Sequence, residues 1–120
     1  LEKVKTHAGD VDFEVQPEHL SLFSNRDFGR YAGEKGEMNV CFISNNDITG
    51  GNSGSAMFNA RGELLGLAFD GNWEAMSSDI LYEPKMQRCI GVDVRYILFM
   101  IEKYGKAGDL IRELKIVSGK

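Results

Sequence analysis

Alternating and continuous apolar positions predict strands in the first part of the chain. Residues 11–15 alternate apolar and polar side chains with period two, which predicts a strand with one buried face that ends at Pro17. Residues 18–37 are interrupted by glycines and predict a long loop with one short turn of helix. Residues 40–43 are continuously apolar, which predicts a strand buried on both faces.

A hairpin is expected next. Residues 56–58 and 63–69 have the composition of strands, and the Asn and Gly of residues 59–62 suit the tight connection between them. Residues 90–92 predict a further strand. We therefore expect a mostly β segment over about residues 8–93.

The spacing of apolar residues changes after Asp93. Apolar side chains then recur at helical spacing, Asp93 is suited to capping the first turn, and Gly105 is suited to closing the last. The pattern predicts helices over about residues 94–103 and 107–116.

Composition and charge exclude several classes of protein. The 120 residues suffice for one domain or a piece of one, and the net charge of −4 is spread without a basic patch, which argues against nucleic acid as a partner. The longest apolar run, residues 96–101, is far shorter than the roughly 20 residues of a membrane-spanning helix. Because the chain starts without Met or an apolar signal core, we expect a piece of a longer protein.

Two cysteines, Cys41 and Cys89, are too few for a disulfide framework and lack the spacing of a zinc site. They leave open both the redox compartment and their own pairing. We expect neither a metal nor an organic cofactor.

The glycine-rich loop at residues 50–55 is the strongest candidate for chemistry. Its sequence, Gly-Gly-Asn-Ser-Gly-Ser, follows one predicted strand and precedes the hairpin. A serine nucleophile needs its hydroxyl held outward on a tight turn, with free backbone N–H groups aimed at the oxygen that becomes negatively charged. Ser53 could be that nucleophile, with the N–H groups of Gly51 and Ser53 as the oxyanion hole.

The same loop sequence admits other interpretations. It could be simply a polar turn between strands. A phosphate-binding P-loop is excluded because no Lys follows the glycines, and the α/β-hydrolase motif is excluded because Ser55 stands where its second glycine belongs.

A resemblance to a known family supports the interpretation of Ser53 as a catalytic nucleophile. The segments NDITGGNSGS (46–55), RGELLGLAFDGNWEAMS (61–77) and VDVRYIL (92–98), with DFGRYA (27–32), resemble the C-terminal part of the bacterial dipeptidyl-peptidase 7 and dipeptidyl-peptidase 11 family. The likeness covers about residues 25–115.

This resemblance implies a fold and an activity. Such proteins are periplasmic or envelope-associated serine peptidases that release dipeptides from the free N-terminus of a peptide, and they combine a chymotrypsin-like double β-barrel with a helical domain. The chain would then be mostly β with C-terminal helices, an incomplete fragment that forms the second barrel. Ser53 would be the nucleophile, with Gly51 in the oxyanion hole, and the strand ending at Phe69 would line the cleft.

The resemblance also assigns two neighbouring residues to the substrate. Asp70 would bind the α-ammonium group of the peptide, for which a carboxylate is a suitable counter-charge. From the residues alone, a two-residue hairpin turn is the favoured interpretation of Asp70-Gly71, and the resemblance shifts the preference to the amine site. The acidic-preferring branch has arginine at the position of Gly71, so glycine here implies a preference for hydrophobic side chains before the cut.

The remaining parts of a catalytic triad are not evident. His7 and His19 match no catalytic motif and are interpreted as ordinary histidines on a strand edge or loop. Asp47 suits a turn, Asp79 a polar loop and Asp93 a helix cap. In the family the catalytic His and Asp lie on the first barrel. We therefore expect this chain to be inactive alone, and its uncovered apolar surface to cause self-association as a homodimer.

Two alternative functions stay open. The chain could be half of a trypsin-like endopeptidase, which would not require a free N-terminus in its substrate. It could also be a barrel that binds peptides without cutting them.

Overall fold

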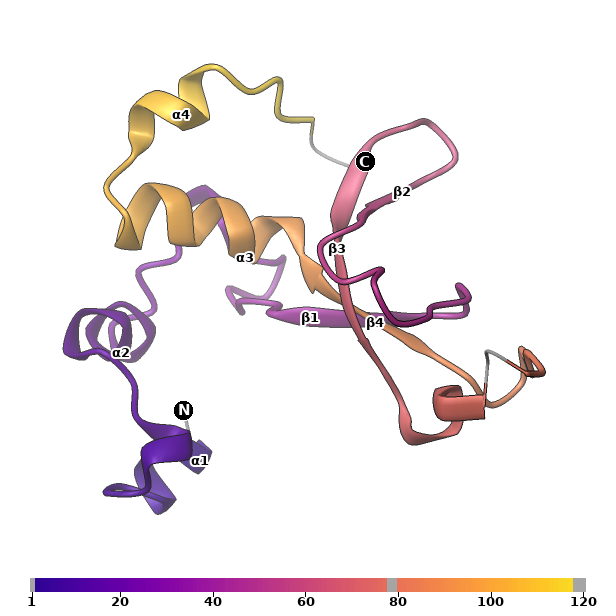
Figure 1. Ribbon diagram of the computed structural model, residues 1–120. Coiled ribbons are helices and arrows are strands. Elements are labelled where there is room, and N and C mark those ends of the chain that lie inside the picture. The colour runs from indigo at the N-terminus through magenta and orange to yellow at the C-terminus, as the bar shows by residue number, and fades with distance from the viewer. Residues whose placement is uncertain (1, 78–79, 118–120) are drawn as a thin grey trace.

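Four antiparallel strands form one open sheet with the order β1-β4-β3-β2 (Figure 1). The computed structural model describes residues 2–77 and 80–117. The strands are β1 (Cys41–Ser44), β2 (Ala56–Phe58), β3 (Leu64–Gly71) and β4 (Cys89–Asp93). β3 and β4 form the centre of the sheet, and β1 and β2 form its edges.

The predicted hairpin is confirmed as the pairing of β2 with β3. Ala56 lies opposite Leu67, and the side-chain Oδ1 of Asn59 accepts hydrogen bonds from the N–H groups of Arg61 (2.9 Å) and Glu63 (3.0 Å). Gly62, at a φ of +74°, supplies the left-handed residue that closes the turn. The strand predicted at residues 90–92 is also confirmed within β4.

β1 corrects the expectation of a strand buried on both faces. It pairs with β4 alone, and its residues alternate between exposed and half-buried, with Ile43 68% exposed. The apolar run correctly predicts a strand at these residues. Its burial is lower than predicted because β1 is an edge strand that pairs with β4 alone.

The helix predicted after Asp93 is confirmed. α3 (Val94–Phe99) continues into the π-helical turn η4 (Met100–Tyr104), and the Asp93 side chain caps it by accepting a hydrogen bond from the Arg95 N–H (2.8 Å). The second predicted helix is shorter than expected, because α4 spans Gly108–Arg112.

The N-terminal third is helical, which contradicts two expectations. Its elements are α1 (Glu2–Thr6), the 3₁₀ turns η1 (Val11–Phe13) and η2 (Gly29–Tyr31), and α2 (Pro17–Ser24). The strand expected at residues 11–15 was wrong, because the Asp10 carboxylate accepts a hydrogen bond from the Asp12 N–H and caps a turn there. Pro17 begins a helix instead of only ending a strand, as its fixed φ allows at a first helical position.

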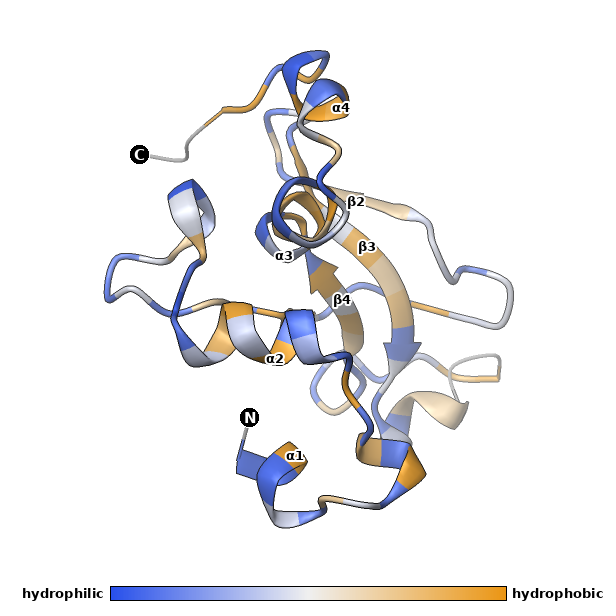
Figure 2. Ribbon diagram, turned by 90° about the vertical axis from the view of Figure 1, so that its left-hand side faces the viewer, coloured by the Kyte–Doolittle hydropathy of each residue, from blue (hydrophilic) through white to orange (hydrophobic). Residues whose placement is uncertain are grey.

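Two hydrophobic cores hold these parts together. The larger lies between the N-terminal segment and the C-terminal helices; its buried residues are Phe28, Tyr31, Leu98, Phe99 and Ile111. The smaller lies on the sheet, with Met57, Ala68 and Cys89 packed against Phe42 and Ile48. Figure 2 shows that β3 is hydrophobic along most of its length and becomes hydrophilic at its C-terminal tip.

The description of the chain as mostly β is wrong, since more of the described residues lie in helices than in the twenty strand residues. Within the described part, the sheet is open, with β1 and β2 each paired on one side. A second barrel of a double-barrel peptidase stays an expectation for the whole protein.

Gly66 provides a test of the close contact between β3 and β4. A Cβ at this position would lie 2.0 Å from the Val92 carbonyl oxygen and 2.8 Å from Cε1 of Phe42. We predict that Gly66→Ala lowers the free energy of unfolding by about 1–3 kcal/mol, the usual cost of overpacking, measured by urea unfolding. Gly108→Ala is the control: a Cβ at this first residue of α4 would lie 3.8 Å from Nη1 of Arg112, an ordinary contact, and the stability of this variant should be unchanged or slightly increased. Equal stabilities of the two variants would contradict the prediction.

His19 provides a test of the packing of α2. Its ring packs against Phe23 and Tyr104, its Nε2 lies 3.3 Å from the Tyr96 hydroxyl, and burial lowers its pKa. The unfolded chain binds the His19 proton more readily, so the fold should lose stability as the pH falls below the ordinary histidine value of about 6.5. His19→Gln should reduce this dependence in unfolding curves at about pH 5 and pH 8. An identical pH dependence in both proteins would refute it.

Candidate active site

The glycine-rich loop is held in shape by Asn52. Its Oδ1 accepts a hydrogen bond from the Thr49 N–H (3.0 Å), its N–H donates to the Thr49 carbonyl (3.2 Å), and its own carbonyl accepts from Ser55 (2.9 Å). Gly51 and Gly54 adopt φ values of +93° and +87°, which side chains with a Cβ disfavour. The loop therefore has one glycine with a positive φ before Ser53 and one after it.

Two backbone hydrogen bonds attach this loop to β3. The Gly54 N–H donates to the Ala68 carbonyl (2.7 Å), and the Ala68 N–H donates to the Ser55 carbonyl (2.9 Å). Ser53 consequently lies beside Phe69, and its Oγ donates a hydrogen bond to the Phe69 carbonyl (3.3 Å). The Ser53 side chain is exposed on its turn, as a nucleophile requires.

The backbone N–H groups of Gly51 and Ser53 are candidate donors to a ligand. Among the hydrogen bonds of the described residues, neither group donates to a protein acceptor. Two N–H donors on a glycine-rich turn beside a serine are the kind of group that stabilises an oxyanion. They are therefore available to a ligand oxygen.

A β-bulge at Phe69 shapes the end of β3. Ala68 pairs with Gly91 and Asp70 pairs with Ile90, so Phe69 is the extra residue between them. A bulge bends the strand and redirects its side chains, which is why bulges occur beside binding sites. Here it directs the Phe69 carbonyl to Ser53.

Asp70 and Gly71 belong to the strand itself. Gly71 pairs with Cys89 on β4, so the alternative interpretation of Asp70-Gly71 as a hairpin turn is wrong. The Asp70 carboxylate is exposed and accepts a hydrogen bond from the Gly71 N–H (2.8 Å). It is thus a solvent-accessible negative charge at the tip of β3.

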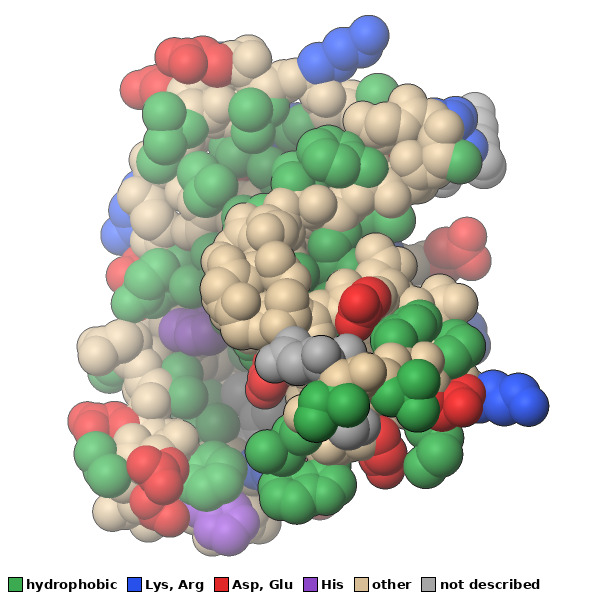
Figure 3. Space-filling view, turned by 45° about the vertical axis from the view of Figure 1, so that its right-hand side comes forward, with side chains coloured by type: hydrophobic (Ala, Val, Ile, Leu, Met, Phe, Trp, Pro, Cys, Tyr) green, Lys and Arg blue, Asp and Glu red, His purple; other side chains and the backbone are tan. Residues whose placement is uncertain are grey.

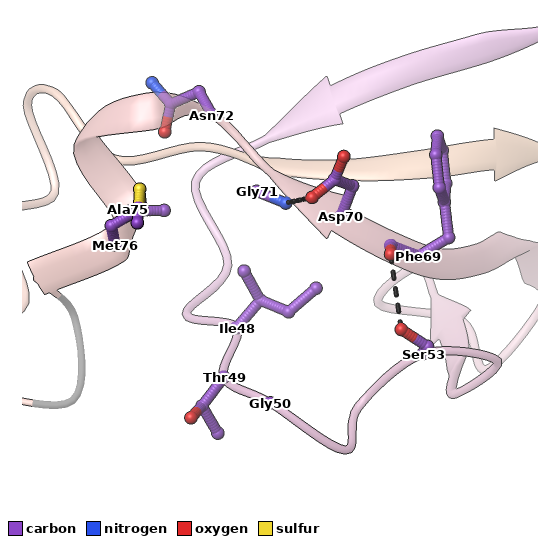
Figure 4. A pocket seen from close by; sticks show the side chains of 10 residues that line it. All are labelled: Ile48, Thr49, Gly50, Ser53, Phe69, Asp70, Gly71, Asn72, Ala75 and Met76. Atoms are coloured by element: carbon purple, nitrogen blue, oxygen red, sulfur yellow. Dashed lines mark hydrogen bonds between the residues drawn. The ribbon is translucent and has the colours of Figure 1, made fainter.

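A cavity of about 250 Å³ brings these residues together (Figure 4). Ser53, Phe69, Asp70 and Gly71, all expected from the sequence, line it, while Gly51 adjoins it on the loop. Figure 4 shows Ser53 at one end of the cavity and the 3₁₀ turn η3 (Trp73–Ser77) at the other. The sequence did not identify the other lining residues, which are Ile48, Thr49, Gly50, Asn72, Ala75 and Met76.

The absence of a histidine leaves the serine without a base in this part of the chain. Within the described residues, the Phe69 carbonyl is the one hydrogen-bond partner of Ser53 Oγ, and no histidine lines the cavity. His7 stacks on Phe13, and His19 packs against Tyr96.

The candidate aspartates do not supply the third triad member either. Asp93 caps α3 and forms an ion pair with Arg95 (2.6 Å), and Asp47 does not line the cavity. Asp79 lies outside the described residues.

The described ranges show no cluster of metal-ligating side chains. Residues 2–77 and 80–117 contain no group of three His, Cys, Asp or Glu side chains that could hold a metal ion.

Cys41 and Cys89 are free thiols, and burial raises the pKa of each. No helix in the part that the structure describes has the length and apolar character to cross a membrane.

Comparisons with known proteins identify close relatives. A family model described as Peptidase S46 matches residues 1–116. Dipeptidyl-peptidase 7 of Porphyromonas endodontalis is 61% identical over 108 residues, covering 90% of this chain and 13% of that protein. The Asp/Glu-specific dipeptidyl-peptidase of Capnocytophaga gingivalis is 51% identical over 110 residues, covering 91% of this chain and 15% of that protein.

Solved structures agree with this similarity. The crystal structure of Porphyromonas endodontalis DPP11 in complex with the dipeptide Arg-Asp has a TM-score of 0.89 and 43% sequence identity, and covers 96% of this chain. This chain spans 13% to 17% of the length of the proteins named here.

Proposed function

Because the chain belongs to the peptidase S46 family, we propose that the whole protein is a serine-type dipeptidyl-peptidase in which this chain supplies the nucleophile and part of the substrate site. The observation that carries the proposal is the placement of Ser53 and Asp70 in one cavity, at the bulged end of β3. Identity of 61% to a dipeptidyl-peptidase 7 supports the same reaction class.

In this proposal Ser53 Oγ attacks the carbonyl carbon of the second residue of the peptide. The negative charge that develops on the carbonyl oxygen is stabilised by the N–H groups of Gly51 and Ser53. The C–N bond then breaks, the shortened peptide leaves with a proton, and water hydrolyses the ester to release the dipeptide. The base that accepts the serine proton comes from a part of the protein outside this chain, so the chain alone is inactive.

In this proposal Asp70 fixes the number of residues between the free N-terminus of the peptide and the cut. Its exposed carboxylate lies on the same strand end as the Ser53 partner Phe69, which suits a counter-charge for the α-ammonium group at a fixed distance from the cut. Gly71 adds no side chain to the cavity, which leaves room for an apolar residue before the cut. We therefore propose a hydrophobic preference at that residue.

The exposed apolar side chains of this chain would be covered in the whole protein. Figure 3 shows hydrophobic side chains intermixed with acidic ones on one face of the molecule. Ile43, Phe58 and Trp73 are 68%, 60% and 81% exposed. We propose that a preceding barrel and a helical domain cover this surface, and that an isolated chain would dimerise through it.

We also propose, from the family resemblance, that the whole protein acts in the periplasm or cell envelope.

Ser53→Ala tests the nucleophile in the whole protein. We predict at least about a thousandfold loss of kcat for dipeptide release, followed by mass spectrometry. Ser55→Ala is the matched control, because this exposed serine lies in the same loop but does not line the cavity, and its kcat should stay near that of the parent. N-acetylated peptides should resist cleavage. Equal cleavage of free and acetylated peptides would favour an endopeptidase, and absence of Ser53-dependent cleavage would favour a binding barrel.

Asp70→Asn tests the recognition of the free amine. Because a charge-assisted hydrogen bond is lost, kcat/KM for free peptides should fall by about 10- to 100-fold, mainly through a higher KM. Glu63→Gln neutralises a carboxylate that pairs with Arg61 at the far end of the same hairpin and should leave kcat/KM near that of the parent. An Asp70→Asn enzyme with the parent's KM would exclude this role.

A further inference from the structure

Asn72, the residue that follows β3, uses all of its polar groups. Its N–H donates to the Arg88 carbonyl (3.0 Å), and its Oδ1 accepts from the Arg88 N–H (2.8 Å). Its Nδ2 donates to the Met86 carbonyl (2.8 Å) and to the Glu74 carboxylate (2.7 Å). Its own carbonyl accepts a hydrogen bond from the Ala75 N–H (2.9 Å) and so starts η3. One side chain thus joins the end of β3, η3 and the segment that leads into β4.

The segment to which Asn72 is attached is itself well ordered by hydrogen bonds. The Arg88 guanidinium donates to the carbonyls of Pro84 (2.9 Å) and Lys85 (3.1 Å). Gln87 is 2% exposed; its Oε1 accepts from the Glu83 N–H (2.9 Å), and its Nε2 donates to the Leu81 carbonyl (3.1 Å). Asn72 therefore connects η3 to residues 86–88, a segment that is itself held by several hydrogen bonds.

The position of η3 determines what lies above Gly71. A Cβ on Gly71 would lie 2.9 Å from the Ala75 Cβ and 3.5 Å from Cγ2 of Ile48. Figure 4 shows Ala75 on η3 at the end of the cavity away from Ser53, with Gly71 and Ile48 between them. The Ala75 methyl group lies too close to Gly71 for a Cβ to fit there, so it bounds the cavity beside Gly71, and a movement of η3 would change the space at this point.

We infer that Ala75 determines how large a substrate side chain this end of the cavity admits, and that Asn72 is the positioning residue that holds Ala75 there. This inference rests on the proposed function, because it assigns a size limit to the residue before the cut. It adds to the role of Gly71: Gly71 contributes no side chain to the cavity, and Ala75 contributes the methyl group that lies closest to it.

The test uses the whole protein and dipeptide-releasing peptides whose second residue is Ala, Leu or Phe. Ala75→Leu should lower kcat/KM for the Phe peptide relative to the Ala peptide by about tenfold, mainly through KM, because hydrophobic pockets discriminate by added methylene groups. Ala75→Gly should change this ratio in the opposite direction. A ratio unchanged in both variants would overturn the inference.

Asn72 is tested by its effect on selectivity. Asn72→Ala should bring the Phe-to-Ala ratio of kcat/KM closer to one, because η3 is released, and Asn72→Asp, which keeps the acceptor for the Arg88 N–H, should restore part of the selectivity. Asn59→Ala is the matched control, since Asn59 makes comparable hydrogen bonds in the β2–β3 turn outside the cavity. It should lower the melting temperature and leave the ratio unchanged. A uniform loss for all peptides in Asn72→Ala would reduce Asn72 to a structural residue.

The failure of the proposed function is distinguishable from the failure of this inference. If the parent cleaves these peptides and Ser53→Ala does not, yet the Ala75 variants keep the parent's ratio, the inference alone falls. If the parent shows no Ser53-dependent cleavage, both fall. The Ala75 variants change one aliphatic side chain and keep the test decisive even where an Asn72 variant fails to fold.

Discussion

β3 pairs on both of its edges, with β2 and with β4, and every part of the candidate site is attached to it. Its residue Ala68 holds the serine loop through two backbone hydrogen bonds, and its bulge directs the Phe69 carbonyl to Ser53. β4 runs directly into α3 and so connects the sheet to the aromatic core. The two central strands approach each other so closely at Gly66 that the pairing of the site-bearing strand leaves no room for a side chain there.

The cavity carries one half of the chemistry expected of a serine peptidase. Among the described residues it offers a hydroxyl, two N–H groups beside it that donate to no protein acceptor, and an exposed carboxylate, but no imidazole. A hydroxyl without a base is a weak nucleophile, whereas the donors and the carboxylate need no proton transfer to act. This division agrees with a chain that spans 13% to 17% of the length of its relatives named above.

Local patterns were sufficient where a few adjacent residues decide the conformation. The Asn59 turn, the Asp93 cap and the two-strand hairpin followed from such patterns. The strand expected at residues 11–15 failed because alternation is short-range evidence, and the Asp10 carboxylate satisfies a backbone N–H in a turn instead. Burial of residues 40–43 failed because it depends on how many strands flank β1.

The sequence by itself determined which residues could do chemistry: the serine of the glycine-rich loop, and the Asp-Gly pair that the family resemblance assigns to the substrate. Only the tertiary structure decided that these residues share one cavity, that Asp70-Gly71 is a strand end, and that Asn72 and Ala75 form the opposite wall. The physical reason is the separation along the chain of the residues that interact. Turn and cap preferences act over a few residues, whereas the wall depends on hydrogen bonds between Asn72 and residues 86 and 88, which only folding brings together.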